Sequence, residues 1–161
     1  MRVYVGLTRS ALAAAKASGA IDAPLTAHAV TPALRESYAT ADAEELEYVA
    51  LMAAADSCLP LLAASPGEPR RRFVAACEVA DVTADPEAGP SGTAVPQPIP
   101  WRDVKAIHAD DPDAEPTIAA AAAAYAAAQA GDDDARFTVD EADGWELMWF
   151  ATQEADDLLA P

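Results

Sequence analysis

Three segments pass from a strand pattern through a threonine into a helical pattern, and this repeated order constrains the fold most. The segments cover residues 5–8, 30–31 and 150–152. Threonine is favoured at a helix N-terminus because its hydroxyl accepts a hydrogen bond from an otherwise unpaired backbone amide. Strands that alternate with helices are typical of α/β proteins. The sequence therefore predicts an α/β fold with at least one β-α-β unit.

The first half of the chain gives clear signals for where strands and helices start and end. Residues 2–7 alternate and are rich in β-branched and aromatic side chains, which predicts a strand. The helix that follows should end at Gly19, which can adopt the left-handed conformation of a C-cap. A second strand is predicted over 25–30, and Pro32 suits the first turn of the next helix.

A long apolar helix is predicted over 43–64. Asp42 and Glu45 have the spacing of a capping box at its start. Pro60 should kink the helix, because proline removes an interior hydrogen bond. Residues 70–82 then predict a third strand, expected to be the longest of the sheet.

The second half predicts a loop, a strand, a helix and a C-terminal segment that allows two interpretations. Residues 84–100 are rich in proline and glycine and predict a flexible loop, and 101–110 predict a strand. Thr117 should cap an alanine-rich helix that Gly131 ends. After it we predict a helical turn at 138–142, a strand at 145–150 and a last helix capped by Thr152, while a single helix over 139–150 is the alternative.

We therefore predict one domain over 1–161, a small mixed or largely parallel sheet of about five strands with packed helices. The net charge of the chain limits the kinds of partner that it can bind. Ten basic residues stand against 27 acidic ones, giving −17, so no nucleic-acid partner is expected. No apolar run approaches the roughly 20 residues that span a bilayer, and no signal peptide is recognised. We expect no membrane partner and a cytoplasmic location, and we interpret Cys58 and Cys77 as reduced core residues.

Several motifs together resemble a family of short actinobacterial proteins with no assigned activity. They are "MRVYV" with Thr8, "AVTPALRE", "EELEY", "WFATQE" and "DLL", and they cover most of the chain. The resemblance implies an actinobacterial, cytoplasmic protein and supplies no catalytic residues. Members often carry proline in place of Gly6, a difference expected to affect only the first turn. The alanine excess fits a GC-rich genome, and salt adaptation is the rival explanation of the charge.

The strand-to-helix junctions are the first candidate site. If the strands are parallel, these junctions meet at one edge of the sheet, where free amides could bind a phosphate or carboxylate. Capping alone is the simpler interpretation, because each junction needs a threonine for that purpose. The candidate ligand-binding residues are Thr8, Arg9, Thr31, Arg35 and Gln153.

The segment "WELMWF" is the second candidate, as an interface. On a strand, Trp145 and Trp149 share one side while Phe150 takes the other. Two apolar sides suit an inner strand covered on both faces. If one side is exposed, the tryptophans would form a protein interface instead.

Individual polar residues give weaker signals. His28 is interpreted as a packed or hydrogen-bonded core residue, and Asp110 could orient His108 on one strand face. The arginines at 70–72 are interpreted as partners for nearby acids. No phosphate-binding loop, dinucleotide fingerprint or metal motif is present, so no cofactor and no metal are expected and no catalytic residue is assigned.

These observations favour a non-catalytic binding or regulatory module that acts through a protein partner or self-association. The alternative is a small enzyme or ligand-binding domain for a phosphorylated or carboxylated metabolite.

Overall fold

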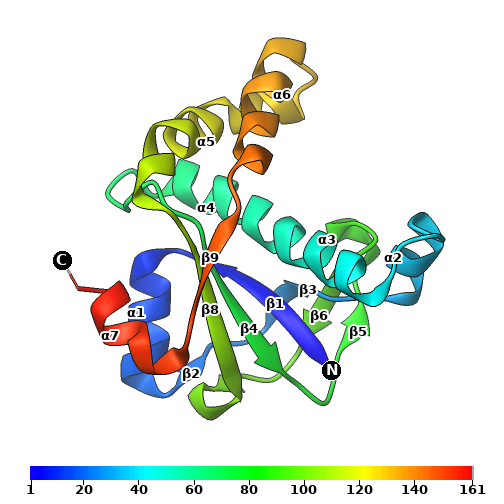
Figure 1. The fold of residues 1–161 in the computed structure, drawn as a ribbon, viewed down its shortest axis with the longest axis vertical. Helices are drawn as coiled ribbons and strands as arrows, with labels where there is room; N and C mark the ends of the chain where they lie inside the picture. Colours follow the sequence, from blue (N-terminus) through cyan, green and yellow to red (C-terminus); the bar gives the residue numbers. More distant parts are fainter. Residues whose placement is uncertain (161) are drawn as a thin grey trace.

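A seven-stranded sheet forms the centre of the computed structural model, which describes residues 1–160. The strand order is β5-β6-β3-β1-β4-β8-β9, and every neighbouring pair is antiparallel (Figure 1). The mixed α/β class is confirmed, but the prediction of about five, largely parallel strands is wrong. The strands are β1 (Arg2–Leu7), β3 (Leu25–His28), β4 (Phe73–Glu78), β5 (Thr83–Ala84), β6 (Gly92–Val95), β8 (Val104–Asp110) and β9 (Leu147–Phe150).

The predicted β-α-β unit is present in a split form. Strands β3 and β4 run in the same direction, because both are antiparallel to β1, which lies between them. The helices α2 (Pro32–Ser37), α3 (Ala43–Asp56) and α4 (Cys58–Ala64) connect them. The third predicted strand, β4, is not the longest of the sheet, because β8 has seven residues and β4 has six.

Residues 84–100 do not form the predicted flexible loop. They contain β6, the short strand β7 (Ile99–Pro100), which pairs with β2 (Ala20–Ile21), and a helical turn, η1 (Pro86–Ala88). Thr93, Val95 and Ile99 are buried. Side chains from this segment close the core, so its proline and glycine content reflects tight turns between short strands.

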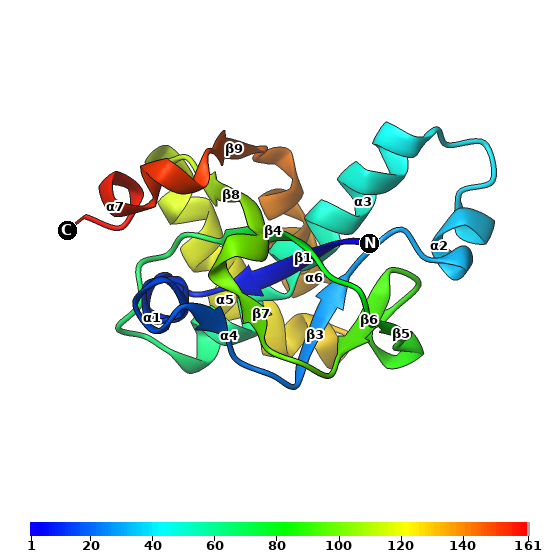
Figure 2. The same cartoon turned by 90° about the horizontal axis from the view of Figure 1, so that it is seen from below.

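Helices cover both faces of the sheet (Figure 2). On one face, α1 (Arg9–Ser18) and α7 (Ala155–Leu158) pack against a cluster that contains Val3, Val5 and Phe73. On the other face, α3 packs against Tyr4 and Val74. This two-sided burial follows from the alternation of β1, in which successive side chains point to opposite faces.

Most of the predicted helix ends are confirmed. Thr8 and Thr31 accept hydrogen bonds from backbone amides of α1 and α2, and Gly19 has a positive φ of 90° at the end of α1. Asp42 and Glu45 form the capping box of α3. Thr152 caps nothing, because it lies inside a helical turn, η5 (Thr152–Glu154).

The long helix breaks at Ser57, three residues before Pro60. A continuous helix would need the Pro60 amide to donate to the Asp56 carbonyl, and proline has no amide hydrogen. Helix α3 therefore ends at Asp56 and α4 restarts at Cys58. By length and composition Ala43–Ala64 could cross a membrane, which the sequence interpretation missed. Part of the segment packs against the sheet and α5, and 39% of its most apolar window is buried.

A separate layer stands above α4 at the top of Figure 1. It consists of α5 (Glu115–Gln129), α6 (Asp133–Asp140) and the turn η4 (Glu141–Gly144), which share a hydrophobic cluster with α4. We call this layer the α5–α6 lobe. Helix α5 begins before Thr117, so Thr117 is not its cap. Helix α6 is longer than the helical turn predicted at 138–142. The alternative prediction of a single helix over 139–150 is wrong, because 147–150 form β9. Two further turns are η2 (Trp101–Asp103) and η3 (Pro112–Ala114).

Candidate functional site

The five predicted ligand-binding residues do not come together. Because β3 and β9 run antiparallel to β1, Thr8 and Arg9 lie at the opposite end of the sheet from Thr31 and Gln153. Arg9 donates to the Leu159 carbonyl. Arg35 lies beside Tyr38 and Glu47 in a groove between α2 and α3. The expectation of one shared edge is therefore wrong, since it depended on parallel strands.

A buried ion pair links Arg72, directly before β4, to Asp110, the last residue of the neighbouring strand β8. Arg72 and Asp110 are both fully buried. Their side chains form two bonds: Nη2 to Oδ1 and Nε to Oδ2, each 2.9 Å. The Arg72 amide also donates to Asp110 Oδ2 at 2.8 Å. This two-pronged geometry suits a guanidinium and a carboxylate, and it offsets the cost of removing both charges from water.

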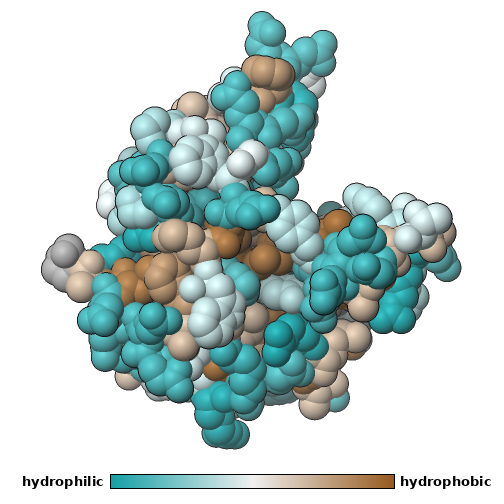
Figure 3. Space-filling view, viewed as in Figure 1, coloured by the Kyte–Doolittle hydropathy of each residue, from teal (hydrophilic) through white to brown (hydrophobic). Residues whose placement is uncertain are grey.

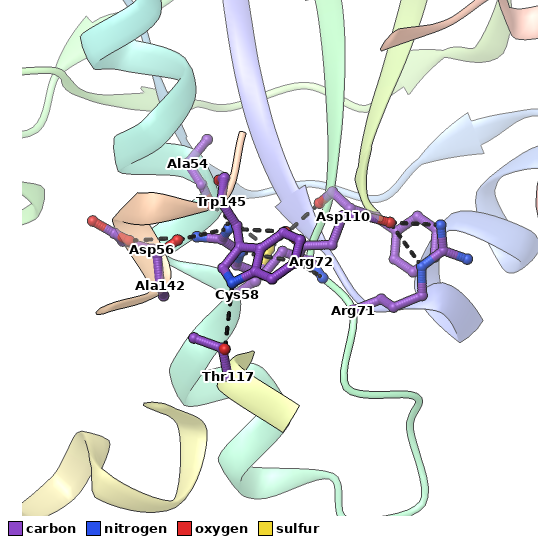
Figure 4. A network of polar contacts seen from close by, with 10 residues as sticks. Ala54, Asp56, Cys58, Arg71, Arg72, Asp110, Thr117, Ala142 and Trp145 are labelled. Carbon is purple, nitrogen blue, oxygen red and sulfur yellow. Dashed lines mark hydrogen bonds and ion pairs between the residues drawn. The ribbon is translucent and has the colours of Figure 1, made fainter. Parts of the chain in front are cut away.

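The same arginine ties the α5–α6 lobe to the sheet (Figure 4). Its Nη2 donates to the carbonyls of Ala142 and Trp145, at 3.2 and 3.3 Å. The Trp145 indole in turn donates to the Thr117 hydroxyl at 3.3 Å. The prediction that arginines 70–72 pair with acids is confirmed for Arg72, while its complete burial was missed. Asp110 holds Arg72, and so it does not orient His108.

Asp56 faces the free end of Arg72. Nη1 of Arg72 has no hydrogen-bond partner, and its distance to Asp56 Oδ1 is 3.9 Å. Partial burial, which leaves 48% of the side chain exposed, raises the pKa of Asp56 to about 7. The charge of Asp143 and a hydrogen bond to it also raise this pKa, and the charge of Arg72 lowers it. Carboxyl groups with strongly shifted pKa values are concentrated at functional sites.

Asp56 and Asp143 lie in a cleft of about 450 Å³ between the sheet, α3–α4 and the α5–α6 lobe. Figure 3 shows the molecule hollowed between this lobe and α3. Five parts of the chain contribute polar groups: β3, the α3–α4 junction, η1, α5 and the segment from α6 to η4. The charged residues in its lining are the acids Asp56, Glu87, Asp140 and Asp143 and one base, Arg136.

The remaining polar groups of the cleft are neutral. His28 is buried and its Nδ1 lies 2.8 Å from Ser91 Oγ, so its interpretation as a hydrogen-bonded core residue is confirmed. Burial lowers its pKa, which keeps the ring uncharged at neutral pH. Tyr125 and Gln129 contribute a hydroxyl and an amide from α5. The cleft thus combines excess negative charge with several hydrogen-bonding groups.

Neither a metal-binding cluster nor a reactive thiol is present among the described residues. Among residues 1–160 no three His, Cys, Asp or Glu side chains are grouped to hold a metal ion. Cys58 and Cys77 are free and buried, as predicted, and burial raises the pKa of each thiol to about 12. Neither would be a thiolate at neutral pH.

Sequence reasoning missed the cleft, although one signal was present. Asp56 is the single charged residue between 48 and 64, inside an otherwise apolar helix. A charge in that position must either reach water or find a partner. Asp140 and Asp143 gave no such signal, because they lie in a stretch where acids are frequent.

Replacing Asp56 by asparagine is expected to stabilise the protein more at pH 8 than at pH 5. The pKa of Asp56 is raised in the folded state, so folded protein retains a proton that unfolded protein releases between about pH 4 and 7. Stability is therefore lost as pH rises through this window. We expect the gain in Tm to be about 2–4 °C larger at pH 8, measured by thermal unfolding.

The control Asp133→Asn removes an exposed carboxylate outside the cleft and should change Tm equally at both pH values. An Asp56→Asn effect that does not depend on pH would show that Asp56 is already ionised at pH 5.

The two tryptophans of the predicted interface have different environments. Trp145 is partly buried against the α5–α6 cluster, whereas 61% of Trp149 is exposed. Strand β9 lies at the edge of the sheet, so the prediction of an inner strand is wrong. Trp145 belongs to the core, and Trp149 remains available for contacts.

Comparisons with curated proteins and with solved structures each found no match. A comparison with protein-family models found one match, which covers residues 1–159. The resemblance inferred from the sequence motifs is thus confirmed as membership of an uncharacterised family, and the match runs through every element that forms the ion pair, the cleft and the edge strand. The chain belongs to the family of unknown function DUF6912.

Proposed function

We propose that the protein is a non-catalytic binding module that acts through a protein partner and receives a basic side chain of that partner in its cleft. The observation that carries this proposal is the convergence of four carboxylates and one arginine on a single cleft. An arginine or lysine side chain fits such a site, because its cation would gain several charge-assisted hydrogen bonds.

The charge of the whole molecule supports the same class of partner. A net charge of −17 creates a field that attracts basic surfaces and increases their rate of association. A phosphorylated or carboxylated metabolite would meet repulsion from the same carboxylates. The proposal includes a cytoplasmic location in an actinobacterium. The two buried, unpaired thiols support the cytoplasmic location, because thiols stay reduced in the cytoplasm.

Two small probes that differ in charge test the cleft. N-acetyl-arginine methylamide should bind with about millimolar affinity, while its neutral citrulline counterpart should not bind. Two-dimensional NMR should show the shifts at backbone amides around Tyr125, Gln129 and Asp143. Binding should strengthen as pH rises through about 7, because Asp56 then becomes charged.

The variant Glu87→Gln/Asp140→Asn removes two cleft carboxylates and should weaken binding about 5- to 10-fold. Its matched control, Asp133→Asn/Asp134→Asn, removes two exposed carboxylates outside the cleft lining. Equal loss in both variants would mean that the probe responds only to net charge, and equal binding of the citrulline probe would exclude a cation site.

A further inference from the structure

Strand β9 leaves one edge of the sheet unprotected. It is the last strand in the order and pairs only with β8. Its residues Leu147–Phe150 include no charge and no proline, and the register shift in the sheet lies elsewhere, in β4 beside β8. The other edge strand, β5, has two residues. Natural proteins usually protect an edge with charges, bulges or very short strands, so an apolar four-residue edge requires an explanation.

The four side chains of β9 are three half-buried residues, Leu147, Met148 and Phe150, and one exposed aromatic residue, Trp149. Leu147 packs against the α3-side cluster and Phe150 against the α1-side cluster. Trp149 lies opposite His108 of β8 and is 61% exposed. Helix α3 packs mainly over β1, β3 and β4, so this part of the sheet face is left without a covering helix.

Charge near the edge selects the kind of occupant. Residues 144–157, which include β9, hold four acids and no lysine or arginine, and one of the acids, Asp156, pairs with Lys16. Glu146, directly before β9, is exposed and forms no ion pair among the described residues. A second copy of the chain would bring the same acids against this edge and would be repelled. A basic segment would be attracted.

We propose that the β9 edge binds an extended, lysine- or arginine-bearing segment of another protein as an eighth strand of the sheet. Its backbone pairs with the free amides and carbonyls of β9, and one basic side chain lies over the Trp149 indole. Strand addition supplies affinity through main-chain hydrogen bonds, and the indole attracts a cation through its ring face. This surface lies outside the lining of the cleft, so the proposal stands without the cleft.

Two peptides of equal charge test whether the edge pairs as a strand. The probe Ac-KVKVKVK-NH2 can form main-chain hydrogen bonds, whereas Ac-KPKPKPK-NH2 lacks the amide hydrogens at alternate positions. The first should bind at least 10-fold more tightly by calorimetry and should slow amide hydrogen exchange at residues 147–150. Equal binding of both peptides, or protection that is absent from β9, would overturn the proposal.

Substitutions on the protein test the role of Trp149. Trp149→Ser should weaken binding of the first peptide about 5- to 10-fold, while Phe137→Ser removes another exposed aromatic side chain and should change nothing. Glu87→Gln/Asp140→Asn should reduce cleft binding and leave the peptide's protection of the amides at residues 147–150 unchanged, so the two proposals fail separately. If the protein alone sediments as a dimer that Trp149→Ser dissociates, the occupant is a second copy and the proposal is wrong.

Discussion

Replacing Arg72 by methionine is expected to lower the free energy of unfolding by about 3–5 kcal/mol. The substitution leaves the Asp110 carboxylate fully buried without a counter-charge. It also removes the hydrogen bonds that hold the Ala142 and Trp145 carbonyls. Chemical denaturation of the variant should therefore show the loss, and Trp145 fluorescence should show loosening of the α5–α6 lobe.

Two further variants identify the cause. The double variant Arg72→Met/Asp110→Leu removes both charges and should recover much of the lost stability, because a buried pair replaced by apolar residues is often neutral. Lys16→Met breaks an exposed ion pair with Asp156 and should cost less than about 1 kcal/mol. A loss no larger in Arg72→Met than in Lys16→Met would show that water reaches Asp110.

The helix ends were predictable because their physical causes are local. A threonine at a strand end, the Asp42–Glu45 spacing and a glycine after a helix each act within four residues. Their hydrogen bonds form whatever the rest of the chain does. The same reasoning failed at Thr152. The turn begins at Thr152 itself, so Ala151 is its N-cap, and the Glu154 carboxylate accepts a hydrogen bond from the Ala151 amide.

Strand direction was not predictable because it depends on contacts far apart in the sequence. Strand β1 pairs with β4 some seventy residues later, Tyr4 opposite Ala76, and nothing in either segment specifies an antiparallel register. Helical connections between strands suggested parallel neighbours, yet α1 and the α5–α6 lobe each connect antiparallel neighbours. Helices α2–α4 do connect two strands of the same direction, β3 and β4, but β1 lies between them. Strand β6 was missed because four residues that begin with glycine and are followed by proline carry too little periodicity.

The candidate site shows the same limit. Arg72 and Asp110 are 38 positions apart, and Asp56 meets Asp143 across 87. In the sequence each acid resembles the many other acids of this chain, and only the fold buries Asp110 and brings Asp56 and Asp143 into one cleft. Only Asp56 could be distinguished from the other acids by its local sequence, because it is the single charged residue in an apolar stretch. Trp149 could be assigned to core or interface only once β9 was placed at the edge.

The neighbours of Gly6 in this chain leave no space for a side chain, so Gly6→Ala should cost about 1–3 kcal/mol. A Cβ at this position would meet the Ala54 carbonyl oxygen at 2.5 Å and Cys58 Sγ at 3.1 Å, and would clash with the Ser57 hydroxyl. Backbone at the α3–α4 junction cannot move aside without disturbing Asp56. The expectation that Gly6 affects only the first turn is therefore wrong, since it lies in β1 against this junction.

The control Gly67→Ala places a methyl group where no atom lies within 4 Å, and stability should change by less than about 0.5 kcal/mol. Because Gly6 sets how closely the α3–α4 junction approaches β1, Gly6→Ala should also shift the NMR signals of Asp56 and Ser57. A variant that is as stable as the control, with these signals unmoved, would mean that the junction lies farther from β1 and that the cleft is wider on this side.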